Sequence, residues 1–330
     1  MTQSVSVIAT VLNEAASIDR LLRSLARQTR LPDEVVVVDG GSTDGTAEAL
    51  DAFCRQAPFA MQVLVLPGAN ISAGRNAAIQ AAAGPIIAIT DAGVRLEPDW
   101  LERLTAPFAE EPAPDVVSGF FVPEYRSLFE RVLGAITLPR LEEIDPERFY
   151  PSSRSVALRR EAWAWVGGYP EWLDYCEDLL FDFALRDAGY RFAFARDAVV
   201  HFRPRTDLES YYRQYYRYAR GDGKADFWRY RHALRYGTYL VGVPLLMRLA
   251  LRNPAWLLLG GAGACAMLRG NYRRLAPHLE GLSRTDRLRA LAWVPVIRIV
   301  GDVAKMLGYP VGVWWRLRHG PSGSWPKRQL

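Results

Sequence analysis

The sequence predicts an α/β fold, a doubly wound, mostly parallel sheet followed by a helical C-terminal region. Two observations predict this organisation. Short apolar runs alternate with segments of helical spacing through the N-terminal part of the chain. Beyond Pro204 the composition changes to Tyr and Arg residues interleaved with two long apolar blocks. We therefore expect an α/β domain over residues 1–225 and a helical region over residues 226–330.

The first elements alternate between strand and helix. The run from Val5 to Leu12 is typical of a strand, and Ile18 to Gln28 carries its apolar residues at helical spacing. Crossovers between parallel strands are right-handed, so the strand ends that carry Asp39 and Asp91 should meet in one crevice. The elements between and around them are a strand over 35–38, a helix over 46–55, a strand over 61–66, an Ala-rich helix over 71–83 and a strand over 85–90.

The stretch from Val35 to Thr46 marks the clearest strand end. Four consecutive valines predict a strand that is buried on both faces, and the Gly, Ser and Thr residues after it predict a turn. Asp39 is the first polar residue beyond the valines, so its carboxylate should project at the ligand-binding edge of the sheet. Ser42, Thr43 and Asp44 can cap the next helix. A strand-turn-helix joint without a ligand would show the same pattern.

The later part of the α/β domain is less regular. The loop-rich segment 139–155 holds three prolines and several charges, and we expect it to be a mobile segment over the crevice. An acidic pair, Glu177-Asp178, begins a helix that ends near Gly189. The other expected elements are a helix over 100–108, a strand over 116–121, a helix over 156–169 that ends at Gly167-Gly168, and two short strands that end at His201.

Length and composition restrict the class of protein. Half of the 330 residues are hydrophobic, which allows a sizeable core and excludes disorder as a description of the whole chain. The three cysteines, Cys54, Cys176 and Cys265, have unrelated spacings, so we expect reduced thiols in a cytosolic compartment and no zinc site. The N-terminus leads almost directly into a strand-like run, and we expect no signal peptide.

Charge is distributed unevenly along the chain. Residues 1–202 hold 18 Lys and Arg against 29 Asp and Glu, whereas residues 203–330 hold 23 against 7. A basic segment interleaved with Trp, Tyr and Leu suits an anionic membrane surface. No compact basic stripe or known motif predicts a nucleic-acid partner.

Two apolar blocks, Thr238–Leu268 and Leu291–Trp315, follow in the basic part. Arg248 and Arg252 interrupt the first block and leave arms shorter than the roughly 20 residues of a full membrane span. Helices that lie in, or dip into, the membrane interface fit this pattern, and two or more true spans or a soluble helical subdomain are the alternatives. The second block carries charged residues at the spacing of helix-surface neighbours, namely Arg298, Asp302 and Lys305.

Six motifs occur in order between residues 4 and 225. They are TVLNE (10–14), VVVDGGSTDGT (36–46), GRNAAI (74–79), TDAG (90–93), the pair Glu177-Asp178, and QYYRY (214–218). This ordered set resembles the family 2 glycosyltransferases, which are inverting enzymes with a GT-A fold. Two departures are visible: Gly40 and Gly93 stand where the family usually has a second aspartate.

The resemblance implies a nucleotide-sugar donor. Asp39 would form a hydrogen bond with the base and Arg75 would pack against it; a loop cap and a surface ion pair are the respective structural alternatives. Thr10, Asn13 and Glu14 of the first motif would belong to the same donor site.

A divalent cation, Mg²⁺ or Mn²⁺, is also implied, since charge builds on the leaving diphosphate. Asp91 would contact the ribose or the ion. His201 resembles the histidine that completes the metal site in many GT-A enzymes, with a buried core histidine as the alternative. Gly93 removes a ligand of the usual D-x-D motif, and Arg217 offers a fixed positive charge there.

The resemblance assigns acid-base chemistry to the acidic pair. A helix N-terminus favours ionised carboxylates, and Asp178 matches the general base of the family, with Glu177 in support or in contact with the acceptor. Plain helix capping is the alternative. QYYRY resembles the Q-x-x-R-W element of membrane-associated polysaccharide synthases, which would place Arg217 near the diphosphate and Gln214 and Tyr218 near the acceptor. An amphipathic helix on a membrane would show the same residues.

These observations lead to three hypotheses of function. The first is a membrane-associated inverting glycosyltransferase at the cytoplasmic face that acts on a lipid-linked or polysaccharide acceptor. The second is a nucleotidyltransferase, although residues 10–18 lack the basic Gly-rich loop of that class. The third, motivated by Gly93, is a degenerate scaffold that binds nucleotide or membrane. With only two apolar blocks, an enzyme of the first kind should make single or limited additions.

Overall fold

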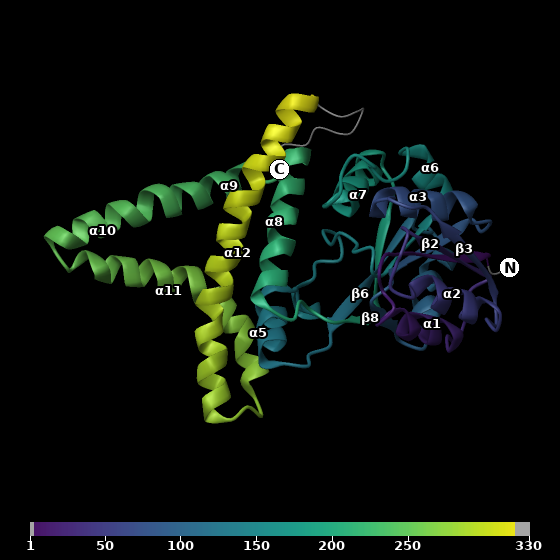
Figure 1. Cartoon of the computed structure of the whole chain (residues 1–330), viewed down its shortest axis with the longest axis horizontal. Coiled ribbons are helices and arrows are strands. Elements are labelled where there is room, and N and C mark those ends of the chain that lie inside the picture. The colour runs from purple at the N-terminus through teal and green to yellow at the C-terminus, as the bar shows by residue number, and fades with distance from the viewer. Residues whose placement is uncertain (1–2, 321–330) are drawn as a thin grey trace. The chain divides into compact units, whose positions relative to one another are not determined.

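The computed structural model describes residues 3–320, which are shown in Figure 1. The chain divides into two compact units, each described by itself below. The first unit comprises Met1–Glu124 and Pro139–Arg203, and the second comprises Tyr125–Leu138 and Pro204–Leu330. The sequence-based division at residue 225 lies at the end of helix α8 (Leu208–Ala225), whereas the compact units divide between Arg203 and Pro204, so that α8 belongs to the second unit.

The first unit contains an eight-stranded sheet in the order β3-β2-β1-β4-β7-β6-β8-β5. Strands β3, β2, β1 and β4 are parallel. Strand β7 is antiparallel to β4 and β6, and β5 is antiparallel to β8. The predicted α/β fold is confirmed, with a mixed sheet. The strands are β1 (Val5–Val11), β2 (Glu34–Asp39), β3 (Ala60–Val65), β4 (Ile86–Asp91), β5 (Val94–Leu96), β6 (Val116–Pro123), β7 (Val156–Arg159) and β8 (Phe192–Phe202).

Helices cover both faces of the parallel half. The four valines of β2 are each at most 1% exposed, as expected for a central strand between two helical layers. Ile8, Val36 and Ile87 pack with residues of α3 and α7 on one face, and Figure 1 shows α1 and α2 on the other. The helices of this unit are α1 (Ile18–Ala26), α2 (Thr46–Cys54), α3 (Ile71–Ala81), α4 (Trp100–Thr105), α6 (Arg160–Trp165) and α7 (Glu177–Asp187), with short 3₁₀ turns at Ala106–Ala109 and Leu141–Glu143.

Four elements differ from the predicted secondary structure. Residues 156–169, predicted as one helix, form strand β7 and the short helix α6, because residues 156–159 pair with β4 and β6 from distant parts of the chain. The two short strands predicted before His201 are one strand, β8. Strand β5 was not predicted, because it has only three residues and no periodic pattern. Helix α5 (Leu128–Thr137) was not predicted either, although its apolar residues have helical spacing.

The second unit is helical. Its longest helix, α12 (Arg284–His319), and helix α8 run along each other in Figure 1. A Cβ atom added at Gly312 would lie 2.0 Å from the backbone oxygen of Arg220, and one at Gly308 would lie 2.1 Å from that of Tyr216. Glycine at these positions therefore allows the two backbones to touch. The remaining elements are α5, α9 (Arg229–Tyr236), the π-helix η3 (Gly237–Gly242), α10 (Val243–Arg252), α11 (Trp256–Leu275) and the 3₁₀ turn η4 (Ala276–Leu279).

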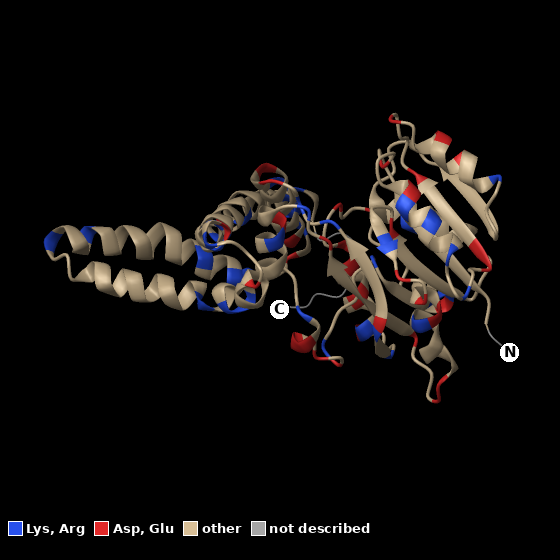
Figure 2. Cartoon of the chain, turned by 90° about the horizontal axis from the view of Figure 1, so that it is seen from below, with Lys and Arg blue, Asp and Glu red and all other residues tan. Residues whose placement is uncertain are grey.

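Helices α10 and α11 form a hairpin that exposes apolar side chains. Leu251 is 88% exposed and Leu258 is 78% exposed, and neighbouring large apolar residues are also exposed. Figure 2 shows the hairpin as mostly uncharged, with blue Lys and Arg segments at its turn and near its base. Among residues 3–320, no helix combines the length and the apolar character that a membrane crossing requires.

Substitution of Gly312 by alanine tests the close contact of α8 and α12. We expect Gly312→Ala to lower the free energy of unfolding by about 1–3 kcal/mol, since the added methyl group meets backbone atoms that cannot move away independently. The measurement is urea unfolding followed by circular dichroism. The control is Gly261→Ala, because nothing lies within 4 Å of a Cβ atom at Gly261 on α11. Equal effects of the two substitutions would contradict the tight contact.

Candidate functional site

A buried arginine joins two carboxylates at the end of the parallel strands. Arg75, on α3, donates from Nη1 to Glu177 Oε1 at 2.8 Å and from Nη2 to Asp91 Oδ1 at 3.2 Å. Its side chain is 3% exposed. Burial opposes the charge, but the nearby carboxylates, Glu177 first and then Asp91, outweigh burial and raise the pKa of Arg75. The fold therefore brings three predicted site residues into one cluster.

Gly74 explains how Arg75 reaches this position. A Cβ atom at Gly74 would lie 2.8 Å from Thr10 Cγ2 on β1, so a larger residue would push α3 away from the sheet. Thr10 is in register with Asp91 on the neighbouring strand β4. Because Gly74 lies close to Thr10, Arg75, which follows Gly74 on α3, lies beside Asp91. The GRN part of the third motif has a packing role as well as a chemical one.

Asn76 holds the loop that precedes α7, a role that the sequence reasoning missed. Its Nδ2 donates to the backbone oxygen of Tyr169 and to Glu171 Oε1, both at 2.9 Å. Its Oδ1 accepts from Trp163 Nε1 at 3.1 Å and from the backbone NH of Tyr169 at 2.7 Å. Tyr169 in turn places its ring 5.4 Å from the Arg75 guanidinium. The amide of Asn76 therefore links α3 to the loop that leads to the acidic pair.

Arg154 is a second residue that the sequence reasoning missed. Its Nε lies 3.7 Å from Asp91 Oδ2, on the side opposite the oxygen that Arg75 contacts. Its guanidinium lies 4.6 Å from the ring centre of Phe202 and 5.8 Å from that of Phe121. Thr90 Oγ1 also donates to the backbone oxygen of Arg154 at 2.9 Å. Arg154 lies in the segment predicted as a mobile loop, so no periodic pattern pointed to it.

Three of the four carboxyl groups of α7, those of Glu177, Asp178 and Asp182, have different environments. Glu177 is buried, and burial followed by the charge of Asp178 raises its pKa to about 7 despite the pairing with Arg75. Asp182 is 4% exposed, and burial, then the charge of Asp178, raises its pKa well above the ordinary value. Asp182 Oδ2 has no hydrogen-bond partner within residues 3–320. Asp178 is half-buried and is the most accessible of the three.

Asp39 shapes the turn after β2. Its Oδ1 accepts from the backbone NH of Gly41 at 3.1 Å, and from the NH and Oγ of Ser42 at 2.9 Å and 2.7 Å. The loop-cap alternative is therefore part of its role. Its Oδ2 has no hydrogen bond with any residue in the described range, which leaves one oxygen for a further donor.

Asn13 and Glu14 tie the end of β1 to the same turn. Asn13 adopts a left-handed conformation with φ of 55°, and its Oδ1 accepts from the backbone NH of Thr43 at 2.9 Å. The backbone NH of Glu14 donates to Thr46 Oγ1 at 2.8 Å. A Cβ atom at Gly93 would have Glu14 Oε2 as its neighbour, at 3.9 Å. Residues of the first, second and fourth motifs thus lie at one edge of the sheet.

The predicted metal ligands do not form a metal site by themselves. Both oxygens of Asp91 face guanidinium groups, those of Arg75 and Arg154. His201 lies on β8, where its Nε2 is 2.5 Å from Glu97 Oε1 and its Nδ1 is 3.8 Å from Glu124 Oε1. No group of three His, Cys, Asp or Glu side chains in the described part of the chain is arranged to hold a metal ion.

The three residues predicted from QYYRY lie on α8 in the second unit. Gln214 Nε2 donates to Tyr218 Oη at 2.6 Å, and its Oε1 accepts from Arg205 Nε at 3.2 Å. Arg217 is exposed on the same helix. Gln214 and Tyr218 are thus brought together by their spacing of one helical turn.

Comparisons with known proteins agree on a class of enzyme. Residues 6–160 match the family model described as "Glycosyl transferase family 2". Glycosyltransferase AglE of Haloferax volcanii is 31% identical over 201 residues, which cover 59% of this chain and 65% of AglE. The succinoglycan biosynthesis protein ExoA of Rhizobium meliloti is 28% identical over 276 residues, covering 79% of this chain and 82% of ExoA. The chain thus matches slightly less than two thirds of the length of AglE.

Solved structures share the fold at low sequence identity. The mannosyltransferase PcManGT of Pyrobaculum calidifontis, in complex with GDP-Man and Mn²⁺, has a TM-score of 0.56 at 22% identity, over 96% of this chain and 87% of that one. TarS residues 1–349 of S. aureus, in complex with UDP-GlcNAc, has a TM-score of 0.52 at 18% identity, over 96% and 92% of the two chains. These likenesses support the predicted GT-A type fold.

Removal of the Asn76 amide tests its role in holding the loop before α7. We expect Asn76→Ala to lower the free energy of unfolding by about 1–3 kcal/mol, because the Trp163 and Tyr169 donors lose their acceptor. Urea unfolding followed by tryptophan fluorescence measures the effect. Gln80→Ala, an exposed position on the same helix, is the matched control and should change stability by less than about 0.5 kcal/mol. If both variants were equally stable, Asn76 would not anchor the loop.

Proposed function

We propose that this chain is a glycosyltransferase that inverts the anomeric centre of its donor sugar, since residues 6–160 match the model described as "Glycosyl transferase family 2". In the proposed reaction the sugar moves from a nucleotide-sugar to a hydroxyl group of a lipid-linked or polysaccharide acceptor. The acceptor oxygen attacks the anomeric carbon, the bond to the diphosphate breaks, and the hydroxyl proton passes to Asp178.

The observation that carries the proposal is the difference between the carboxyl groups of Glu177, Asp178 and Asp182 on α7. A general base must be ionised and must reach the substrate. Glu177 is buried and paired with Arg75, and the protonated form of Asp182 is favoured by burial. Asp178 combines accessibility with a place in the first turn of the helix, where the dipole favours the carboxylate. Asp178 is therefore the proposed base, with Glu177 in support.

The donor is proposed to bind at the edge formed by the first two motifs and Asp91. Asp39 would accept a hydrogen bond from the base through Oδ2, while Thr10, Asn13 and Glu14 would shape the floor of the site. Both terminal nitrogens of Arg75 donate to carboxylates, so we propose that Arg75 acts by positioning these carboxylates rather than by packing on the base. Asp91 would contact the ribose or the ion.

We propose that a divalent ion, Mg²⁺ or Mn²⁺, binds together with the donor. The described residues lack a three-ligand cluster, so the diphosphate would have to supply most of the ligands, with Asp91 as the main protein ligand and His201 as the other predicted one. A bound ion would offset the charge on the leaving diphosphate. Arg154 places a fixed positive charge next to Asp91 in either case.

The acceptor and the location are proposed from the second unit. Its exposed apolar residues and its excess of Arg support association with the anionic cytoplasmic face of a membrane. ExoA is named for the biosynthesis of a polysaccharide, which supports a polysaccharide or lipid-linked acceptor. Gln214 and Tyr218 would contact that acceptor, and Arg217 would approach the diphosphate.

Replacement of the proposed base should separate chemistry from binding. We expect Asp178→Asn to lower the transfer rate by at least about 100-fold, since the amide cannot take the proton. Release of nucleoside diphosphate from UDP-, GDP- and dTDP-sugars measures the rate, and thermal shift measures donor binding, which should be retained. Asp187→Asn, at the exposed end of the same helix, is the control and should keep its activity. Near wild-type turnover of Asp178→Asn would refute the assignment.

Chelation and a substitution at Gly93 test the ion. We expect EDTA to abolish transfer and Mg²⁺ or Mn²⁺ to restore it. Gly93→Asp should lower the concentration of Mn²⁺ needed for half-maximal activity, because it adds a carboxylate two residues from Asp91 in space bordered by Glu14. Gly93→Asn adds the same volume without the charge and is the control. Full activity in EDTA would exclude a required ion.

A further inference from the structure

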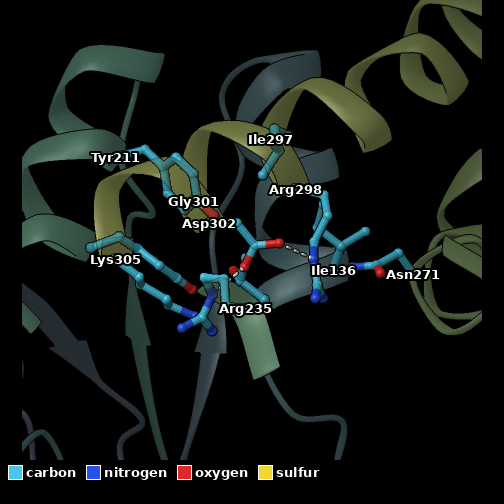
Figure 3. Close-up of a pocket in the computed structure, with 11 residues that line it drawn as sticks. Ile136, Tyr211, Arg235, Asn271, Ile297, Arg298, Gly301, Asp302 and Lys305 are labelled. Carbon is cyan, nitrogen blue, oxygen red and sulfur yellow. Dashed lines mark hydrogen bonds and ion pairs between the residues drawn. The ribbon is translucent and has the colours of Figure 1, made fainter. Parts of the chain in front are cut away.

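The helical unit contains a polar pocket of about 220 Å³, drawn in Figure 3. It is open on one side and lies among α5, α8, α9, α11 and α12. Three of its lining side chains are cationic and one is anionic, and several can donate hydrogen bonds. The residues that matter here are Thr137, Tyr211, Asn271, Arg235, Arg298, Asp302 and Lys305.

Asp302 holds two arginines at the wall of this pocket. Figure 3 shows Arg235 and Arg298 approaching the carboxylate from two sides. Arg235 Nε donates to Oδ1 at 2.8 Å, and Arg298 Nε donates to Oδ2 at 2.9 Å. Tyr239 Oη also donates to Oδ2, at 3.0 Å. Both arginines use Nε for this carboxylate, and Arg235 Nη1 lies 3.1 Å from His232 Nδ1. Nη2 of Arg235 and both terminal nitrogens of Arg298 have no hydrogen bond to another residue between 3 and 320, so they can donate to a second anion.

Lys305 has no anionic partner. Its Nζ lies 4.7 Å from the ring centre of Tyr215, and it makes no hydrogen bond or ion pair with any residue between 3 and 320. Burial, and then the charge of Arg235, lowers the pKa of Lys305 to about 8. A partly buried ammonium group beside two arginines is unfavourable unless an anion completes the site.

We propose that this pocket binds the phosphate group of an anionic lipid. Three cations face one carboxylate, so the pocket has a net positive charge that a phosphate would balance. Guanidinium groups present paired donors that match phosphate oxygens, and Lys305 adds a point charge. Thr137 and Asn271 provide further polar contacts at the same wall. The site is separate from the carboxylate cluster of the first unit and does not depend on the proposed transfer reaction.

The elements around the pocket favour a lipid over a free phosphate. Helix α9, which carries Arg235, continues through η3 into α10, and α11 returns to the pocket at Asn271. The hairpin between these points exposes large apolar side chains, including Leu240, Leu245 and Leu258. A ligand with a phosphate in the pocket could therefore place its acyl or prenyl chains along the hairpin. Free phosphate would make no use of this apolar surface.

Titration calorimetry of the full chain tests the proposal with three probes. They are inorganic phosphate, dihexanoyl phosphatidic acid and dihexanoyl phosphatidylcholine. We expect the phosphatidic acid to bind more tightly than either of the others. Lys305→Met combined with Arg298→Gln should weaken its binding by about tenfold or more, since two charge-assisted contacts are lost. The control is Arg284→Gln combined with Arg289→Gln, which removes two exposed charges from the same helix.

Each outcome decides the question. Equal binding of phosphatidic acid to the wild type and to the double variant would overturn the pocket. Equal affinities for inorganic phosphate and phosphatidic acid, both lost in the double variant, would overturn the lipid assignment. The single variant Lys305→Met separates loss of binding from misfolding. Removal of the Lys305 ammonium leaves no carboxylate without a partner, so the thermal midpoint of this variant should not fall. The variant should still weaken binding.

Discussion

The buried pairing of Arg75 with Asp91 and Glu177 is the constraint on which the first unit depends. Removal of one partner from a buried ion pair costs about 3–5 kcal/mol, so the three residues are coupled in stability. This pairing requires three elements to keep their positions, namely the strand that ends at Asp91, the helix that carries Arg75 and the helix that begins at Glu177. The candidate site at this edge of the sheet and the packing of the unit are therefore maintained by the same contacts.

The parallel half of the sheet was predictable because local patterns match its structure. A strand covered on both faces is a continuous apolar run, and β2 is such a run. The half of the sheet with mixed strand directions was harder to predict. Strand β7 has only four residues and owes its conformation to pairing with β4 and β6, which are far away in sequence. Local spacing over residues 156–169 favoured a helix, and long-range pairing overrode it.

The site was predictable where a residue ends a strand or begins a helix. Asp39, Asp91 and Glu177 all hold such positions, and the topology predicted one crevice for Asp39 and Asp91. Arg154 and Asn76 were not predictable, because each acts through a contact with a distant segment and has no local signature. The predicted metal site of Asp91 and His201 also required two distant segments to meet, which local patterns do not determine. His201 contacts Glu97 and Glu124, and Asp91 contacts two arginines.

Charge balance explains why Arg154 matters at this edge. Arg75 is matched against Asp91 and Glu177, and Asp178 adds a further negative charge. Taken alone, these groups would repel the diphosphate of a donor. Arg154 adds a positive charge that reduces this negative charge. Its guanidinium packs against Phe121 and Phe202 and faces the oxygen of Asp91 that Arg75 does not contact. A cation fixed by aromatic packing needs little reorganisation to meet an anion, which is the property that stabilisation of a leaving group requires.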